Sequence, residues 1–429
     1  MNLAFLCYPY HRGGVTRWMA DLAAEVQRQG GTSWFVAPQP RVPFINGRGR
    51  PAMVELFAAM PAAERPILVA PVVSATFEFG TSAYRSSVYA AALHTGVPSD
   101  VPVVVANDSD IWAAAAHLSP RNPMIAVLHG DYVGNDRLVM RYGDAAAAIT
   151  CVSQRVKSRT EAVDRPGHAP LVTIPCGIPM RTTHSPATVP SGQLRLTWVG
   201  RMDESEKRVS DLPKIAATLR DTGLPFTFEL MGDGPARDSL ARSFSDLGLD
   251  SIVRLHRWAS TSEVLDLFAR SDLLLMSSNY EGMPITVMEA LSMGCGIVSS
   301  RVSGVEDYRS HSLASNCLWI YDIGDVSGAT GQIREAAAVS RAVRSAAARA
   351  LAECEFSIGV CAQRYADLLT HLGTARSVGR VSLAAGRAVT ALVSLPVAAQ
   401  RIARLYVARQ YGRSTPATPA PQPSTSHVA

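Results

Sequence analysis

The sequence has very few lysines, no paired cysteine motif and no long apolar run. Only three of its 429 residues are lysines, although Lys and Arg together number 41. The seven cysteines are scattered and never spaced Cys-x-x-Cys, which argues against a disulfide framework or a zinc site and predicts reduced thiols. No segment approaches the roughly 20 apolar residues that a membrane-spanning helix needs. The N-terminus lacks the basic region of a signal sequence, so we expect a first strand there and a cytoplasmic protein.

Acidic residues are missing from the C-terminal part of the chain. Residues 371–429 contain seven arginines and no Asp, Glu or Lys, whereas the rest of the chain is close to neutral. A nucleic-acid partner for the whole chain is therefore not indicated. Hydrophobic residues make up 47% of the sequence and charged residues 18%. This composition suits buried cores, and the length suggests two domains with additions.

Short apolar runs alternate with helical patterns twice along the chain, which is typical of parallel α/β sheets. The first set of expected strands lies at residues 2–8, 32–38, 66–72, 101–107, 124–129, 147–153 and 171–177, and the second at residues 194–200, 226–232, 252–258, 272–278 and 295–300. We predict two doubly wound, Rossmann-like domains facing a central cleft, because ligands of such sheets bind beyond the carboxyl ends of the strands. The predicted parts are an N-terminal domain over residues 1–185, a linker over 186–193, a C-terminal domain over 194–355, helices over 356–412 and a disordered tail over 413–429.

Two carboxylates flank a predicted helix start after the strand at residues 272–278. Glu281 lies in the loop, Pro284 begins the helix, and Glu289 follows about two turns later. A helix N-terminus suits a phosphate, and carboxylates accept hydrogen bonds from the vicinal hydroxyls of a sugar or a ribose. The alternative interpretation is that Glu281 caps the helix and Glu289 is solvated.

This motif resembles the Glu-x7-Glu signature of the retaining glycosyltransferases of family 4, which have the GT-B fold. Further matches occur in the right order over residues 9–294. The resemblance implies catalytic roles for Glu281, His129, Arg201 and Lys207, with Arg201 and Lys207 gripping the donor diphosphate and His129 near the transferred sugar. It implies donor binding by Gly13, Gly14, Arg201, Lys207, Gly282, Met283, Pro284, Ile285 and Glu289. The chain departs from the family pattern at Cys176 and Pro179, where Asn and Asp are common.

The resemblance implies transfer, with retention, from a UDP- or GDP-sugar to a glycan, lipid-linked or small-molecule acceptor in polysaccharide or glycoconjugate synthesis. We expect no cofactor and no metal, since cations beyond a strand end can neutralise a leaving diphosphate. Asp108 and Asp110 have the Asp-x-Asp form of another glycosyltransferase fold, but they precede a helix and are interpreted as capping acids. A nucleotide-sugar epimerase of the same fold and a non-catalytic paralogue that binds a glycan or a partner remain alternatives.

The acid-free segment over residues 376–410 has two interpretations. At helical spacing its arginines gather opposite an apolar face, which is typical of a helix that docks on an anionic membrane surface. This interpretation predicts a peripheral protein on the inner face of the cell membrane and suits a lipid-linked acceptor. Alternatively, the apolar face packs on the first domain and the arginines are solvated.

Overall fold

The computed structural model describes residues 1–6, 14–40, 57–58, 60–73, 81–119, 121–163, 167, 169–181 and 192–376. Four predicted features lie wholly or largely outside these residues: Gly13, the linker over residues 186–193, the basic segment over residues 376–410 and the disordered tail over residues 413–429. Among the helices of the described part, none is both long enough and apolar enough to cross a membrane.

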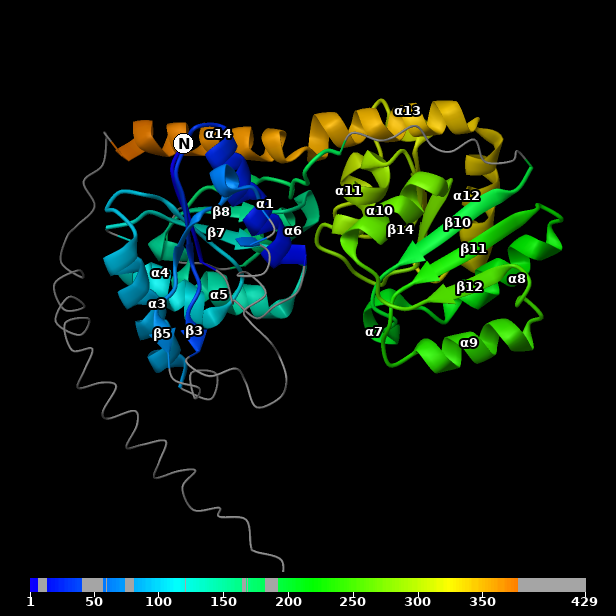
Figure 1. The fold of residues 1–429 in the computed structure, drawn as a ribbon, viewed down its shortest axis with the longest axis horizontal. Helices are drawn as coiled ribbons and strands as arrows, with labels where there is room; N and C mark the ends of the chain where they lie inside the picture. The colour runs from blue at the N-terminus through cyan, green and yellow to red at the C-terminus, as the bar shows by residue number, and fades with distance from the viewer. Residues whose placement is uncertain are drawn as a thin grey trace, which may run out of the picture.

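The first half of the chain forms a seven-stranded sheet with parallel strand pairs (Figure 1). The strand order is β4-β2-β1-β6-β7-β8-β9. Strands are therefore added on both sides of β1, as expected for a doubly wound sheet. A separate parallel pair joins β3 and β5. The bounds are β1 (Leu3–Leu6), β2 (Ser33–Val36), β3 (Gln39–Pro40), β4 (Ile67–Val69), β5 (Val72–Val73), β6 (Val103–Val105), β7 (Met124–Leu128), β8 (Ala146–Cys151) and β9 (Leu171–Thr173).

A second parallel sheet of six strands follows, in the order β12-β11-β10-β13-β14-β15. Two parallel, doubly wound domains were predicted from the alternation of apolar runs and helical patterns, and this fold class is confirmed. The sequence analysis did not predict β15. The bounds are β10 (Leu194–Val199), β11 (Phe226–Met231), β12 (Val253–His256), β13 (Leu273–Met276), β14 (Gly296–Ser300) and β15 (Leu318–Tyr321).

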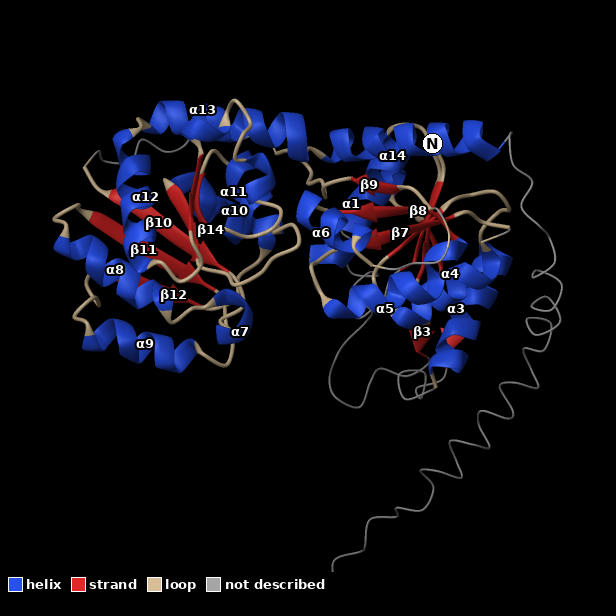
Figure 2. Cartoon of the chain, turned by 180° about the vertical axis from the view of Figure 1, so that it is seen from behind, coloured by secondary structure: helices blue, strands red, loops and turns tan. Residues whose placement is uncertain are grey.

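Helices cover both faces of each sheet (Figures 1 and 2). On the first sheet, α3, α4 and α5 form one layer, and α1 lies with α14 on the other face. On the second sheet, α8, α9 and α12 form one layer and α10, α11 and α13 the other. The bounds are α1 (Gly14–Arg28), α3 (Ser82–Gly96), α4 (Ser109–Leu118), α5 (Val133–Tyr142), α6 (Gln154–Glu161), α7 (Glu204–Lys207), α8 (Asp211–Asp221), α9 (Arg237–Asp246), α10 (Thr261–Arg270), α11 (Ile285–Ser292), α12 (Val326–Ala338), α13 (Arg341–Leu351) and α14 (Ile358–Arg376).

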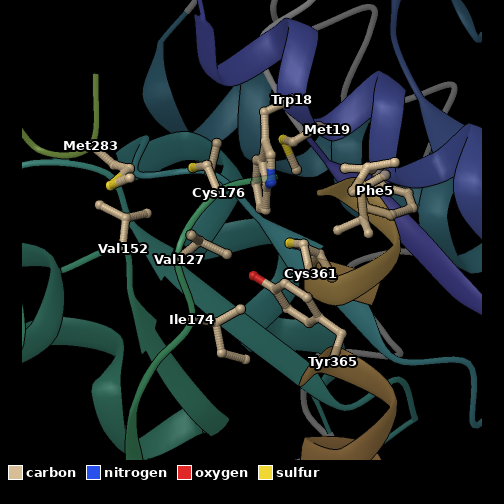
Figure 3. Packing of buried hydrophobic residues seen from close by; sticks show 14 of the residues in the cluster. Phe5, Trp18, Met19, Val127, Val152, Ile174, Cys176, Met283, Cys361 and Tyr365 are labelled. Carbon is tan, nitrogen blue, oxygen red and sulfur yellow. The ribbon is translucent and has the colours of Figure 1, made fainter. Parts of the chain in front are cut away.

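Alternation along β13 divides the core of the second domain into two parts. Leu273 and Leu275 pack with α8, α9 and α12, whereas Leu274 and Met276 pack with α10, α11 and α13, because successive strand side chains point to opposite faces. The second part is continuous with the core of the first domain. Met283, in the loop before α11, belongs to this shared core (Figure 3). Apolar packing therefore joins the two domains beside the predicted site.

The chain crosses back to the first domain through a short bridge after α13. A π-helix, η5 (Ala352–Phe356), follows α13, and Ile178 then pairs with the backbone on either side of Ser357. The Ile178 amide donates to the Phe356 carbonyl and the Ile358 amide donates to the Ile178 carbonyl, both at 2.8 Å. From there α14 runs across the first domain (Figure 1).

Aromatic side chains anchor α14 to α1. The ring centroids of Tyr365 and Trp18 lie 6.2 Å apart, and the Tyr365 hydroxyl lies 3.3 Å from Oγ1 of Thr150 in β8. Figure 3 shows both rings within the apolar cluster. The first domain is thus partly covered by a helix that follows the second domain in the sequence.

A buried carboxylate fixes the start of β13. Asp272 accepts two side-chain hydrogen bonds from Arg195 of β10, at 2.9 and 3.0 Å, and one from Arg344 of α13 at 3.3 Å. Because an unpaired buried charge is costly, these bonds couple the starts of β10 and β13 to the helix layer. The carboxyl ends of the same two strands lead to Arg201 and Glu281.

We predict that Asp272→Asn lowers the free energy of unfolding by about 3 kcal/mol, because it leaves the buried Arg344 without its charge partner. Urea unfolding followed by circular dichroism measures the difference. Asp221→Asn is the matched control: its side chain is 66% exposed and, among the described residues, pairs with neighbouring Arg220 alone, so its cost should stay below about 0.5 kcal/mol. Equal losses in the two variants would contradict the structural role of Asp272.

Candidate active site

Glu281 is held in the loop between β13 and α11 by one hydroxyl group and a cation. The Ser278 hydroxyl donates to Glu281 Oε1 at 2.7 Å, and Lys207 Nζ donates to the same oxygen at 2.6 Å. The Ser277 hydroxyl donates to the Lys207 carbonyl at 2.8 Å, which ties this loop to α7. The Glu281 side chain is only 9% exposed, so these partners replace the water that a buried carboxylate loses.

Arg201 and Lys207 are brought together by Glu206. One carboxylate oxygen of Glu206 lies 2.6 Å from Arg201 Nη2, and the other lies 3.0 Å from Lys207 Nζ. Burial acts to lower the pKa of Lys207, but the adjacent carboxylates of Glu281 and Glu206 outweigh it and hold this pKa above its ordinary value. Lys207 therefore stays a cation at the carboxyl ends of β10 and β13.

The loop that carries these groups touches the first domain through a glycine. A Cβ added to Gly282 would lie 1.7 Å from the carbonyl oxygen of His129, so any side chain there would force the domains apart. A Cβ added to Gly14, the first residue of α1, would lie 2.9 Å from Ile285, the first residue of α11. The starts of α1 and α11 thus face each other closely across the domain boundary.

The residues around the start of α11 differ in their surroundings. Pro284 precedes α11 as its N-terminal flanking residue, in an extended conformation. Met283 is buried at 7% exposure within the shared core, while Ile285 packs against it from the helix start. Met283 is therefore buried in the core that the two domains share.

His129 directly follows β7, and its ring nitrogens are buried. Its ring lies edge-on to Trp18, with centroids 4.9 Å apart, and Nδ1 lies 3.9 Å from Cys176 Sγ. Burial lowers the pKa of His129 to about 3, so the ring is neutral at physiological pH. Within the described part of the chain its Nε2 has no hydrogen-bond partner. The backbone carbonyl of His129 lies against Gly282 of the Glu281 loop.

Glu289 lies on α11 and faces α1 in a small cleft between the domains. Arg17, Asp21 and Arg181 line this cleft with it. Arg17 donates to Asp21 Oδ2 at 3.0 Å and to Thr261 Oγ1 at 3.1 Å. Burial raises the pKa of Glu289 to about 7, with Arg17 and Arg181 opposing the rise and Asp21 adding to it. The structure thus separates Glu289 from the cluster around Glu281.

Two tyrosines and Glu206 belong to the site although the sequence analysis did not identify them. Tyr132 of the first domain and Tyr280 of the second have perpendicular rings 6.2 Å apart, and both are partly exposed. Burial raises the pKa of Tyr132, and the nearby charges of Glu206 and Glu281 add to the rise. In the sequence, only the position of Tyr280 directly before Glu281 could have indicated that one of these three residues belongs to the site.

Both acids of the Asp-x-Asp segment were predicted to cap a helix, but only Asp108 does so. Asp108 Oδ1 accepts from the amides of Asp110 and Ile111, at 2.9 and 3.3 Å, at the start of α4. The Asp110 carboxylate accepts from Ser82 and Arg85 of α3. The two carboxylates are therefore engaged with different elements.

One other group in the described residues offers three potential metal ligands, His311, Cys354 and Glu355, within 4.8 Å of one another. The Leu313 amide donates to His311 Nδ1 at 3.2 Å, and Nε2 of the same ring lies 4.0 Å from Cys354 Sγ. Glu355 pairs with Arg364 at 2.6 Å. Hydrogen bonds and an ion pair account for this group without a metal.

Two family models match the chain in succession. The model described as Glycosyltransferase Family 4 matches residues 12–181, and the model described as Glycosyl transferases group 1 matches residues 193–337. The chain belongs to family 4 of the glycosyltransferases. Residues 12–181, which the first model matches, include His129. Residues 193–337, which the second model matches, include Arg201, Lys207 and Glu281.

Curated relatives of this family 4 chain are distant. The amylovoran biosynthesis glycosyltransferase AmsK of Erwinia amylovora is 25% identical over 187 residues, which are 42% of this chain and 45% of AmsK. The match therefore spans less than half of that relative's length.

Solved structures resemble the chain over most of its length. The lipopolysaccharide outer core galactosyltransferase WaaB in its apo form aligns with a TM-score of 0.64 and 16% identity, over 86% of this chain and 99% of WaaB. HepE of Anabaena in complex with UDP aligns with a TM-score of 0.65 and 17% identity, over 86% of this chain and 100% of HepE. These likenesses confirm the predicted GT-B fold.

We predict that Glu289 makes the folded protein less stable as the pH rises. Its pKa rises from 4.5 to about 7 on folding, so between these values the folded chain holds a proton that the unfolded chain has lost, and stability falls across this window. The loss should reach roughly 3 kcal/mol. Glu289→Gln, which stays uncharged, should lack this loss in urea unfolding at pH 5 and pH 8.

The control for this measurement is Glu161→Gln on α6, a side chain that is 51% exposed. It should follow the pH dependence of the wild type. If the stability of Glu289→Gln shows the same pH dependence as the wild type, the carboxyl group of Glu289 is hydrated in solution and burial does not raise its pKa.

Proposed function

We propose that the protein transfers a sugar from a nucleotide-sugar donor to an acceptor hydroxyl, with retention of the anomeric configuration. The observation that carries the proposal is the cluster of Arg201, Lys207 and Glu281 at the carboxyl ends of β10 and β13. Two cations beside a carboxylate provide charge for a leaving diphosphate and an acceptor for a sugar hydroxyl.

The relatives support the substrate class. The name of AmsK places that enzyme in amylovoran biosynthesis, and HepE has been solved with UDP, with UDP and glucose, and with UDP-glucose. We therefore propose a UDP- or GDP-sugar donor, with the UDP form favoured, and a glycan, lipid-linked or small-molecule acceptor in polysaccharide or glycoconjugate synthesis. A lipid-linked acceptor would suit a protein that works at the inner face of the cell membrane.

In the proposed reaction, the bond between the anomeric carbon and the diphosphate oxygen breaks as the acceptor oxygen bonds to that carbon from the same face. The acceptor proton passes to an oxygen of the leaving diphosphate, so charge and atoms balance. Lys207 and Arg201 stabilise the negative charge that develops on the diphosphate. This charge stabilisation needs no metal, and metal independence is part of the proposal.

The two carboxylates have separate tasks in this proposal. Glu281 is fixed by Lys207 and Ser278 and orients the transferred sugar. Glu289 lies on the other side of the α11 start and holds the ribose hydroxyls, for which its ionised form is the better acceptor. His129, neutral through its burial, contributes hydrogen bonding and not charge.

The first test is a calorimetric screen of nucleotides and nucleotide sugars against the purified chain. At least one nucleoside diphosphate should bind and raise the melting temperature, since a ligand specific for the folded state stabilises it. Slow release of nucleoside diphosphate from the matching sugar donor should persist in EDTA. Failure of every nucleoside diphosphate to bind would overturn the proposed function, and loss of turnover in EDTA would overturn metal independence.

The second test removes the cations one at a time. Lys207→Ala and Arg201→Ala should each reduce turnover by about 100-fold or more, because each removes a preorganised charge from the leaving diphosphate. Lys214→Ala is the control: this lysine is 60% exposed and pairs with Asp211 on α8, so turnover should be unchanged. Turnover near the wild-type rate in both site variants would contradict the assignment.

A further inference from the structure

Glu206 occupies the space between the two cations that the proposed function assigns to the diphosphate. Its two carboxylate oxygens each take one cation, Oε2 binding Arg201 at 2.6 Å and Oε1 binding Lys207 at 3.0 Å. A carboxylate that bridges two cations in this way resembles the non-bridging oxygens of a phosphate, which also accept from both sides. Without a ligand, Glu206 offsets the mutual repulsion of Arg201 and Lys207.

The backbone of Glu206 is held by hydrogen bonds, so a ligand can displace only its side chain. The Glu206 amide donates to the N-cap Asp203 at 3.1 Å, and the Glu206 carbonyl accepts from the Asn279 amide at 2.8 Å. The Asn279 side chain also donates to the Ser205 carbonyl at 2.9 Å. These bonds hold α7 against the loop after β13 whether or not the carboxylate keeps its cations.

Glu206 and Glu281 differ in their freedom to leave Lys207. The Glu281 side chain is 9% exposed and also accepts from Ser278. The Glu206 side chain is 23% exposed, and its carboxylate oxygens contact only the two cations among the described residues. A bound diphosphate brings at least two negative charges, and repulsion would displace the carboxylate that is held less firmly.

We propose that Glu206 is a displaceable carboxylate that holds Arg201 and Lys207 between catalytic cycles and competes with the diphosphate product for them. The proposal rests on the proposed function and adds a positioning residue to it. Donor binding moves the Glu206 side chain out, and its return to the cations promotes release of the nucleoside diphosphate after transfer. No covalent step is involved.

The experiment compares the wild type with Glu206→Gln, which keeps the shape of the side chain and removes its charge. Calorimetry at low salt should show that UDP and inorganic pyrophosphate bind about tenfold more tightly to the variant, because the competing charge is gone. Uridine, which has no phosphate, should bind both proteins equally. Stopped-flow displacement should show slower UDP release from the variant.

Glu204→Gln is the matched control on the same short helix. Glu204 accepts from the amide and the hydroxyl of Ser210, at 2.9 and 2.7 Å, and its carboxylate does not contact Arg201 or Lys207. UDP affinity should therefore be unchanged in this variant. Glu206→Asp keeps the charge but shortens its reach, and should give a smaller gain in UDP affinity than Glu206→Gln.

Several results would overturn the inference. Weaker binding of UDP by Glu206→Gln would mean that the carboxylate holds the cations in place for the ligand and does not compete with it. An equal gain for uridine would show a general change of the pocket. If the wild type binds UDP and Glu206→Gln binds it no more tightly, this inference fails while the proposed function stands. If the wild type binds no nucleoside diphosphate, both fail.

Discussion

The ion pair between Lys207 and Glu281 joins the segments that follow β10 and β13, two neighbouring strands of the second sheet. Both side chains are largely buried, and either charge alone would be costly in that position. The pair therefore fixes α7 and the Glu281 loop relative to each other. The hydroxyls of Ser277 and Ser278 add hydrogen bonds to the same joint. Because parallel strands end at one edge, this joint lies where the second sheet meets the first domain.

Close approach of the domains follows from small residues at this edge. Gly282 lies against the His129 carbonyl, and Gly14 lies against Ile285, so neither position has room for a side chain. Around these contacts, Met283 and the layer of α10, α11 and α13 continue the core of the first domain. The charged cluster is consequently bordered by apolar packing, which lowers the local dielectric and strengthens its electrostatic interactions.

Much of the fold could be predicted from the sequence because buried parallel strands are short apolar runs separated by helical patterns. β15 could not be predicted in this way. Helices usually connect parallel strands, but the chain between β14 and β15 forms two short turns, η3 (Glu306–Tyr308) and η4 (Ala314–Asn316). The family motif identified Arg201, Lys207 and Glu281. It gave no signal for Glu206, because adjacent residues on a helix, such as Glu206 and Lys207, do not normally face each other. In this structure α7 is a single turn followed by Arg208 in the left-handed conformation, and the two side chains do meet.

Burial of individual side chains was the least predictable property, and it decides the chemistry of His129 and Glu289. A histidine at a strand end is equally compatible with an exposed cation and a buried neutral ring. Packing by Trp18 and Cys176, distant in the sequence, selects the neutral ring. The cost of burial thus removes charge from His129 and favours the protonated form of Glu289. In the proposed reaction, Arg201 and Lys207 supply the positive charge for the leaving diphosphate, and in the further proposal the Glu206 carboxylate between them sets how much of that charge a ligand can use.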